Sequence, residues 1–161
     1  MSKQIQDAYI VAATRLPVGK KGGMLATVRP DDMLAHAIRS VVAQVPGLDP
    51  ARIGDVIAGC AMPEGEQGLN VARIGALLAG LPDVVPGYTI NRFCASGIQA
   101  VVDAARQIQL GQAEVVIGAG VESMSAMPQI TGNKLAPNPA IFAGDEHRGI
   151  AYGMGLTAEK V

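Results

Sequence analysis

The residue best suited to covalent chemistry is Cys94, which lies in the stretch Val85–Gly97. This stretch has the pattern of a short strand, an abrupt turn and a helix that opens on the cysteine. Apolar residues recur at helical spacing from Ile98 to Ile108 before Gly111 ends the run. At a helix N-terminus the unpaired N–H groups and the peptide dipoles favour a thiolate, and a cysteine pKa of about 8.5 falls there by one to several units. Cys94 is therefore a candidate nucleophile.

A structural role for this cysteine stays open from the residues alone, because cysteine is often a small buried apolar residue. Its neighbours Ala95, Ser96 and Gly97 are small and leave room for a second backbone or a ligand, which favours the nucleophile. Cys60, the other cysteine, ends a predicted strand, and we expect it to have a structural role.

Composition limits the classes of function. The chain has 161 residues, of which 49% are hydrophobic and 17% charged, enough for one ordinary core. A formal charge of -1 gives no excess of basic surface for nucleic acid. Two cysteines are too few for a disulfide framework, and there is neither an apolar leader nor an apolar run of about 18 residues. We expect a soluble cytoplasmic protein with no membrane span.

Strand and helix patterns alternate along the first three quarters of the chain. Strands are predicted at 7–13, 53–60, 86–91 and 113–120, and helices lie between them. This order predicts the α/β class, with a mostly parallel βαβαβαβ sheet. The run 7–13 is apolar without alternation, which is typical of a strand covered on both faces.

The pattern changes after Ser123, where methionine, proline and glycine interrupt any periodicity. We therefore predict one α/β domain over residues 1–123 and the beginning of an irregular domain over residues 124–161. Residues 157–161 have the pattern of a helix that has just begun, so we expect a truncated chain. Asp145, Glu146 and His147 are adjacent rather than spaced as metal ligands, so we expect no metal site.

Residues 91–100 closely resemble the active-cysteine segment of the thiolases, which cleave or condense 3-ketoacyl thioesters of coenzyme A. Four further segments match the family in the same order: Arg15–Gly19, Gln67–Arg73, Gly120–Ser125 and Met154–Glu159. The resemblance implies the N-terminal half of a thiolase-like fold, followed by the start of a loop domain that covers the active site and helps bind coenzyme A. It also implies that Cys94 accepts the acyl group, that its backbone N–H helps hold the thioester oxygen, and that Met154 lines the acyl pocket.

The family's other catalytic groups come from Gly-His-Pro, Cys-x-Gly and Asn-Glu-Ala-Phe motifs, and none of these occurs in this sequence. His36 and His147 match none of them, so neither is a candidate catalytic base. We expect the 161 residues alone to have no turnover and the full-length parent to be active. Coenzyme A and acyl-CoA would be substrates, with no cofactor.

Short-chain thiolases have histidine just before the pocket methionine, where this chain has Gly153. The resemblance is thus stronger to the branch that degrades fatty acids, while chain length and reaction direction stay open. Family members pair through the strand at 86–91, which implies a homodimer or homotetramer. Two alternatives remain: a condensing enzyme similar to the ketoacyl synthases, and a non-catalytic acyl-CoA binding or scaffold protein in which Cys94 is only packed.

Overall fold

The computed structural model describes residues 5–126, 137–144 and 146–161. The chain divides into two compact units, residues 1–131 and 132–161. In its described residues the second unit contains short helices only: η3 (Pro139–Phe142), η4 (Arg148–Ala151) and α5 (Met154–Ala158). The domain boundary predicted after Ser123 stays a prediction from the sequence.

A three-stranded parallel sheet forms the middle of the first unit. β1 (Ile53–Gly59) is the central strand, with β2 (Gly87–Ile90) on one side and β3 (Val115–Gly120) on the other. Ile57 of β1 is level with Tyr88 of β2 and Gly118 of β3. Because all pairs are parallel, the three strands end at one edge of the sheet, and the loops that follow them meet there.

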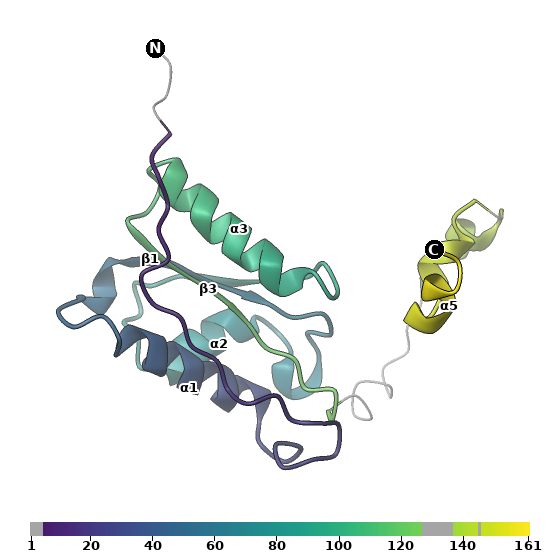
Figure 1. The fold of residues 1–161 in the computed structure, drawn as a ribbon, viewed down its shortest axis with the longest axis horizontal. Helices are drawn as coiled ribbons and strands as arrows, with labels where there is room; N and C mark the ends of the chain where they lie inside the picture. Colours follow the sequence, from purple (N-terminus) through teal and green to yellow (C-terminus); the bar gives the residue numbers. More distant parts are fainter. Residues whose placement is uncertain (1–4, 127–136, 145) are drawn as a thin grey trace. The chain divides into compact units, whose positions relative to one another are not determined.

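Helices cover both faces of this sheet, as Figure 1 shows. α1 (Pro30–Val42) and α2 (Val71–Leu78) lie on one face, and α3 (Ser96–Gln109) lies on the other. Successive residues of β1 point to opposite faces, which divides the core in two. Val56, Ala58 and Cys60 pack toward α1 and α2, and Ile57 packs against α3. The predicted α/β class with parallel strands is confirmed.

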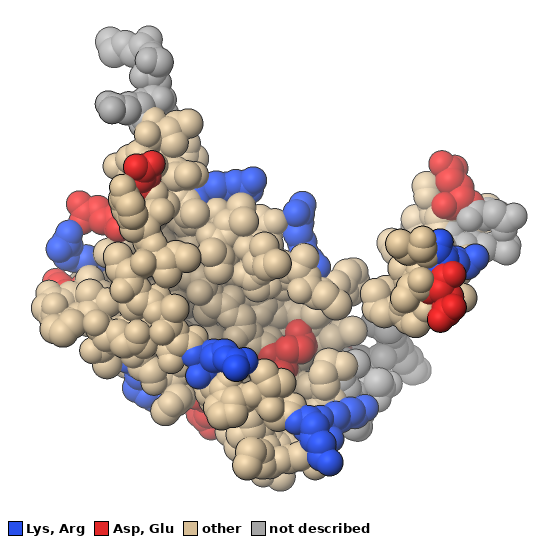
Figure 2. Space-filling model, viewed as in Figure 1, with Lys and Arg blue, Asp and Glu red and all other residues tan. Residues whose placement is uncertain are grey.

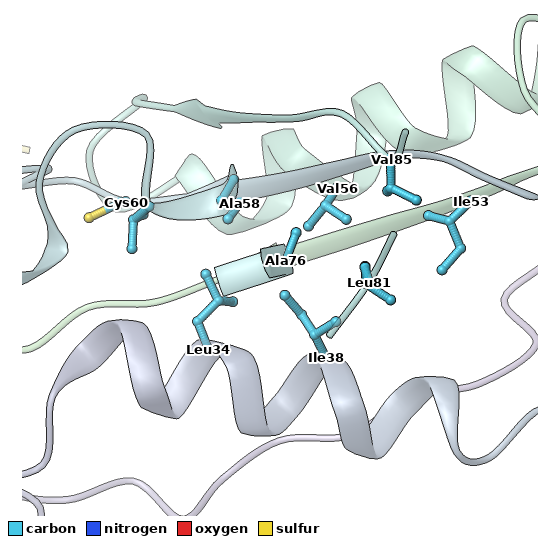
Figure 3. Packing of buried hydrophobic residues seen from close by; sticks show 11 residues of the cluster. Leu34, Ile38, Ile53, Val56, Ala58, Cys60, Ala76, Leu81 and Val85 are labelled. Atoms are coloured by element: carbon cyan, nitrogen blue, oxygen red, sulfur yellow. The ribbon is translucent and has the colours of Figure 1, made fainter. Parts of the chain in front are cut away.

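The larger core lies under α1 and α2 and is built almost entirely from aliphatic residues (Figure 3). Leu34 and Ile38 of α1 are fully buried against β1. Each such side chain contributes about 1.5–3 kcal/mol by leaving water. Gly75 lets α2 approach α1, because a Cβ at this position would lie 2.7 Å from Leu34 Cδ2.

The strand predicted at residues 7–13 is wrong. The segment is extended but unpaired: in the described part of the chain, no backbone N–H from Asp7 to Lys21 donates to another backbone group. Tyr9 and Val11 are 78% and 77% exposed, where the apolar run predicted burial on both faces. A strand requires a ladder partner as well as a suitable composition, and none reaches this segment. The predicted four-stranded βαβαβαβ sheet therefore has three strands in the described residues.

Helix boundaries differ from the predictions by a few residues where local caps decide them. α2 begins at Val71 rather than near Gly68, because Asn70 caps it by accepting a hydrogen bond from Arg73 N at 3.3 Å. α5 begins at Met154, three residues before the helix start that the sequence predicted. Among the described residues, no helix has both the length and the apolar character needed to cross a bilayer.

Candidate active site

Cys94 lies in the turn between β2 and α3. The helix begins at Ser96 with Ala95 as its N-cap, so the cysteine precedes the first helical residue by two positions. Its predicted place at the N-terminal end of a helix is thus found, and the residue is exposed. The thiol is therefore accessible to a reagent or substrate at the edge where the strands end.

The residue before the cysteine has an unusual backbone conformation. Phe93 has φ of 48°, in the left-handed region that costs a non-glycine residue roughly 1–3 kcal/mol. Two neighbouring side chains hold it there: Asn91 Oδ1 accepts a hydrogen bond from Phe93 N at 2.8 Å, and Ser96 Oγ donates one to Phe93 O at 2.6 Å. Ser96 Oγ also accepts from Arg92 N at 2.8 Å, and Ser96 is 3% exposed. We call residues 91–96 the Cys94 turn.

Glycines let this turn lie directly on the sheet. A Cβ at Gly59, the last residue of β1, would lie 2.3 Å from Ser96 C and 2.5 Å from Gly97 N. A Cβ at Gly118 would lie 3.0 Å from Val101 Cα, one turn further along α3. Only glycine permits such an approach of helix backbone to strand backbone. Around Gly97 itself the space is open, with no atom within 4 Å of a Cβ placed there.

A polar network, buried at Gln67 and Ser123 and exposed at Glu122 and Asn91, ties together the loops that follow the three strands. Glu122, after β3, accepts hydrogen bonds from Ala61 N at 2.6 Å and Gln67 Nε2 at 2.7 Å. Gln67 is fully buried, and its Oε1 accepts from Ser123 N at 2.8 Å. Asn91 Nδ2 donates to Ala61 O at 2.9 Å, which links the Cys94 turn to the loop after β1. The turn is thus linked directly to the loop after β1 and, through Ala61, to Glu122 after β3.

Cys60 is buried, whereas Cys94 is exposed. Cys60 is 1% exposed in the core, with its Sγ 3.9 Å from Glu122 Oε1. Burial, together with the negative charge of Glu122, raises the pKa of the Cys60 thiol to about 11. Cys60 therefore stays a neutral thiol near pH 7 and packs as the sequence analysis expected.

The other predicted residue, Met154, is the first residue of α5 and is 67% exposed. It belongs to the second unit and Cys94 to the first, so its predicted role in an acyl pocket stays a prediction. His36 is exposed on α1. In the second unit, His147 Nε2 lies 4.0 Å from Glu146 Oε2. Asp145 lies outside the described residues, which contain no cluster of three or more His, Cys, Asp or Glu able to hold a metal.

This arrangement places an exposed cysteine sulfur on a hydrogen-bonded turn, with open space beside Gly97. In the described residues, no side chain forms a hydrogen bond or ion pair with the Cys94 side chain. A base that removes the thiol proton and an acid that protonates a leaving carbanion are therefore not among its contacts in these residues.

Comparison with known proteins shows the family. A model described as the thiolase N-terminal domain matches residues 8–161, nearly the whole chain. The chain belongs to the thiolase family. It is 45% identical over 158 residues to a 3-ketoacyl-CoA thiolase of Bacillus subtilis (strain 168), covering 98% of this chain and 39% of that protein. It is 50% identical over 127 residues to a beta-ketoadipyl-CoA thiolase of Pseudomonas knackmussii, covering 79% of this chain and 32% of that protein.

A solved structure agrees with this membership of the thiolase family. The crystal structure of the Bacillus anthracis acetyl-CoA acetyltransferase matches with a TM-score of 0.72 and 43% identity, over 77% of this chain and 31% of that one. The thiolase-like fold predicted from the sequence is confirmed. This chain spans roughly a third of the length of the relatives that it matches.

The sequence named the candidate nucleophile but did not predict the hydrogen bonds of its supports: Asn91, Ser96, Gln67 and Glu122. One signal could have found two of them. Asn91 is the last residue of one predicted strand and Glu122 lies two residues after another, and the carboxyl ends of parallel strands meet at one edge of a sheet. Gln67 and Ser96 carry no comparable signal, because tertiary contacts alone show what they bind.

Proposed function

We propose that the intact protein to which this chain belongs is an acyltransferase. It would cleave a 3-ketoacyl-CoA with coenzyme A to acetyl-CoA and a shortened acyl-CoA, or run the reverse condensation, through an acyl-Cys94 intermediate. One observation carries the proposal: the exposed Cys94 lies on a clamped turn at the N-terminal end of α3, whereas Cys60 is buried. The printed names of the relatives, among them 3-ketoacyl-CoA thiolase, support the same reaction.

The reaction divides into two thioester steps. The Cys94 thiolate attacks the ketone carbon, and the bond from that carbon to the CH₂ group next to the thioester carbonyl breaks. Acetyl-CoA leaves as an enolate that takes up a proton. The thiol of a second coenzyme A then attacks the acyl-cysteine and releases the shortened acyl-CoA, which regenerates the Cys94 thiol. Both steps need donors for a developing oxyanion, and a helix N-terminus supplies N–H groups with that orientation.

The described contacts of Cys94 include no base and no acid, so we propose that these groups come from outside this chain. The 161 residues alone should then show no thiolysis in a steady-state assay. Met154 would line the acyl pocket once the second unit is in place. No resident cofactor or metal is part of the proposal.

The deciding experiment is incubation of the intact protein with acetyl-CoA, followed by peptide mapping. We expect acetyl groups on Cys94, no modification of Cys60, and loss of all labelling in Cys94→Ala. Labelling of another residue, or of none, would refute the nucleophile and favour the scaffold alternative. Release of CO₂ from malonyl-CoA with condensation would instead support the ketoacyl synthase alternative.

We further propose that the protein acts in the cytoplasm as a homodimer or homotetramer that pairs through β2. Both cysteines are free, which fits a reducing compartment. β2 is an edge strand, and all four of its residues are partly exposed. Sedimentation of the intact protein tests the assembly: a monomer at micromolar concentration would refute it.

A further inference from the structure

The peptide unit that joins Phe93 to Cys94 is held at its carbonyl end and free at its N–H end. Phe93 O accepts one hydrogen bond from Ser96 N at 3.0 Å and a second one from Ser96 Oγ at 2.6 Å. The N–H of the same unit belongs to Cys94, and in the part of the chain that the structure describes it donates to no protein acceptor. This peptide therefore carries an unused donor beside the sulfur.

The two hydrogen bonds from Ser96 also decide where the Cys94 N–H points. The described residues contain no cis peptide bond, and in a planar trans unit the C=O and the N–H point in opposite directions. Because Phe93 O is directed at Ser96, the Cys94 N–H is directed away from it. A carbonyl that accepts hydrogen bonds also polarises its own peptide, which strengthens the N–H as a donor by about 10–30% per bond.

Asn91 fixes the conformation of Phe93 from the other side. The φ of 48° lies in the left-handed region, and packing contributes little to holding it there, because Phe93 is 65% exposed. Asn91 Oδ1 accepts a hydrogen bond from Phe93 N at 2.8 Å, and Asn91 Nδ2 donates to Ala61 O at 2.9 Å. A change of φ at Phe93 would rotate the Phe93–Cys94 peptide, and the Cys94 N–H would turn with it.

Negative charge that develops at the Cys94 turn depends more on local donors than on basic side chains. The formal charge of the chain is -1, and Figure 2 shows Lys and Arg side chains scattered over the face of the first unit in view rather than gathered in one patch. Within the turn, Arg92 Nη1 donates to Gln99 Oε1 at 2.9 Å, which ties the guanidinium to α3. A fixed N–H beside the sulfur is therefore the group whose direction matters.

We propose that Ser96 and Asn91 are positioning residues, which aim the Cys94 N–H at the oxygen of an acyl group carried by the Cys94 sulfur. Cys94 alone touches that group, since Ser96 acts through Phe93 O and Asn91 through Phe93 N. Attack on the acyl carbon moves the C=O π electrons onto oxygen, and a donor that is already aimed stabilises this charge without rearrangement. The inference rests on the proposed acyl-Cys94 intermediate and adds the residues that orient its donor.

A direct chemical role for the Ser96 hydroxyl does not fit its contacts. The hydroxyl uses its one proton on Phe93 O and accepts a hydrogen bond from Arg92 N at 2.8 Å. Ser96 is also 3% exposed, so its hydroxyl is not accessible to a substrate. Asn91 likewise uses its Oδ1 and Nδ2 on backbone groups. These contacts support a positioning role for both side chains.

The test compares two reactions of Cys94 in the intact protein. Acetyl transfer from acetyl-CoA develops an oxyanion, whereas alkylation by iodoacetamide does not, so the ratio of the two rates separates the N–H donor from the reactivity of the sulfur. Removing one oxyanion donor lowers a rate by roughly 100- to 1,000-fold. Turning the donor without removing it costs less, and we expect the ratio to fall by about tenfold in Ser96→Ala and in Asn91→Ala. Peptide mapping below pH 9 keeps Cys60 silent, because its pKa is about 11.

Two further variants separate the aim of the N–H from a general loss of folding. Glycine adopts the left-handed region without strain, so in the double variant Asn91→Ala/Phe93→Gly the ratio should recover to within about threefold of the parent. Asn91→Ser keeps an oxygen that accepts from the N–H two residues on, though more weakly, and should recover part of the ratio. A fall that neither variant restores would mean that Asn91 does not act through Phe93, which would overturn its assigned role.

The remaining outcomes separate this inference from the proposed function. Arg92→Gln removes an exposed charge and should change the ratio by less than about twofold; a fall equal to that of Ser96→Ala would assign the effect to charge and overturn the inference. If the parent is acetylated on Cys94 and the ratio is unchanged in Ser96→Ala and Asn91→Ala, the inference alone fails. If the parent accepts no acetyl group, the proposed function fails and the inference fails with it.

Discussion

The contact between Gly59 and the start of α3 can be tested by adding one methyl group. In Gly59→Ala the new Cβ would lie 2.3 Å from Ser96 C and 2.5 Å from both Ser96 O and Gly97 N. Non-bonded carbon atoms prefer separations of about 3.5–4.0 Å, so the two backbones must separate by more than about 1 Å. Neither is a flexible side chain that could turn away.

The expected cost follows from this geometry. Overpacking a tight interior costs about 1–3 kcal/mol, and a contact between two backbones belongs near the upper end. Replacing glycine also restricts the unfolded chain, which returns about 0.4–1 kcal/mol. We therefore expect Gly59→Ala to lower the free energy of unfolding by about 2 kcal/mol.

Gly97→Ala is the matched control, because it adds the same group on the other side of this contact. A Cβ there meets no atom within 4 Å, and the residue lies in a helix, where alanine is favoured by about 0.5–1 kcal/mol. Urea unfolding of the 161-residue chain, followed by circular dichroism, measures both variants. If Gly59→Ala unfolds within about 0.5 kcal/mol of the parent, the close approach of α3 to β1 is refuted.

Three further predictions concern the site and its supports. Ser96→Ala removes the hydroxyl that forms hydrogen bonds with Phe93 O and Arg92 N. We expect the free energy of unfolding to fall by about 1–3 kcal/mol and the rate of Cys94 alkylation to change. An unchanged rate would show that the turn does not depend on these two hydrogen bonds. Gln67→Leu leaves the N–H of Ser123 and the carbonyl of Met62 without their side-chain partner. Urea unfolding should then show that the free energy of unfolding falls by about 2 kcal/mol or more. An unchanged free energy of unfolding would mean that water replaces the amide. Burial and the charge of Glu122 raise the pKa of Cys60 from 9.0 to about 11, so the contribution of this thiol to stability is complete below pH 9 and is lost as the pH rises toward 11. Burial also raises the pKa of Tyr88, which adds to the decline of stability at high pH. Unfolding curves should therefore show a smaller decline for Cys60→Ala than for the parent, and an equal decline would contradict the prediction.

Several features of the fold follow from local pattern in the sequence. The buried stripe of α1, its start at Pro30 and the apolar run of β1 were all predictable, because period and capping residues are local signals. The position of Cys94 before a helix was predictable for the same reason. The strand predicted at residues 7–13 failed because composition shows that a segment can be an inner strand but cannot supply its partner.

What the sequence determined by itself is the class of the fold, the family and one candidate nucleophile, Cys94. Those depend on residue types at fixed spacing, which are present before any folding occurs. Tertiary structure alone decided that Gly59 lies against Ser96 and that Gln67 joins the loops after β1 and β3. These contacts join residues far apart in the chain, and their free energies depend on how closely two backbones approach, which no local pattern encodes.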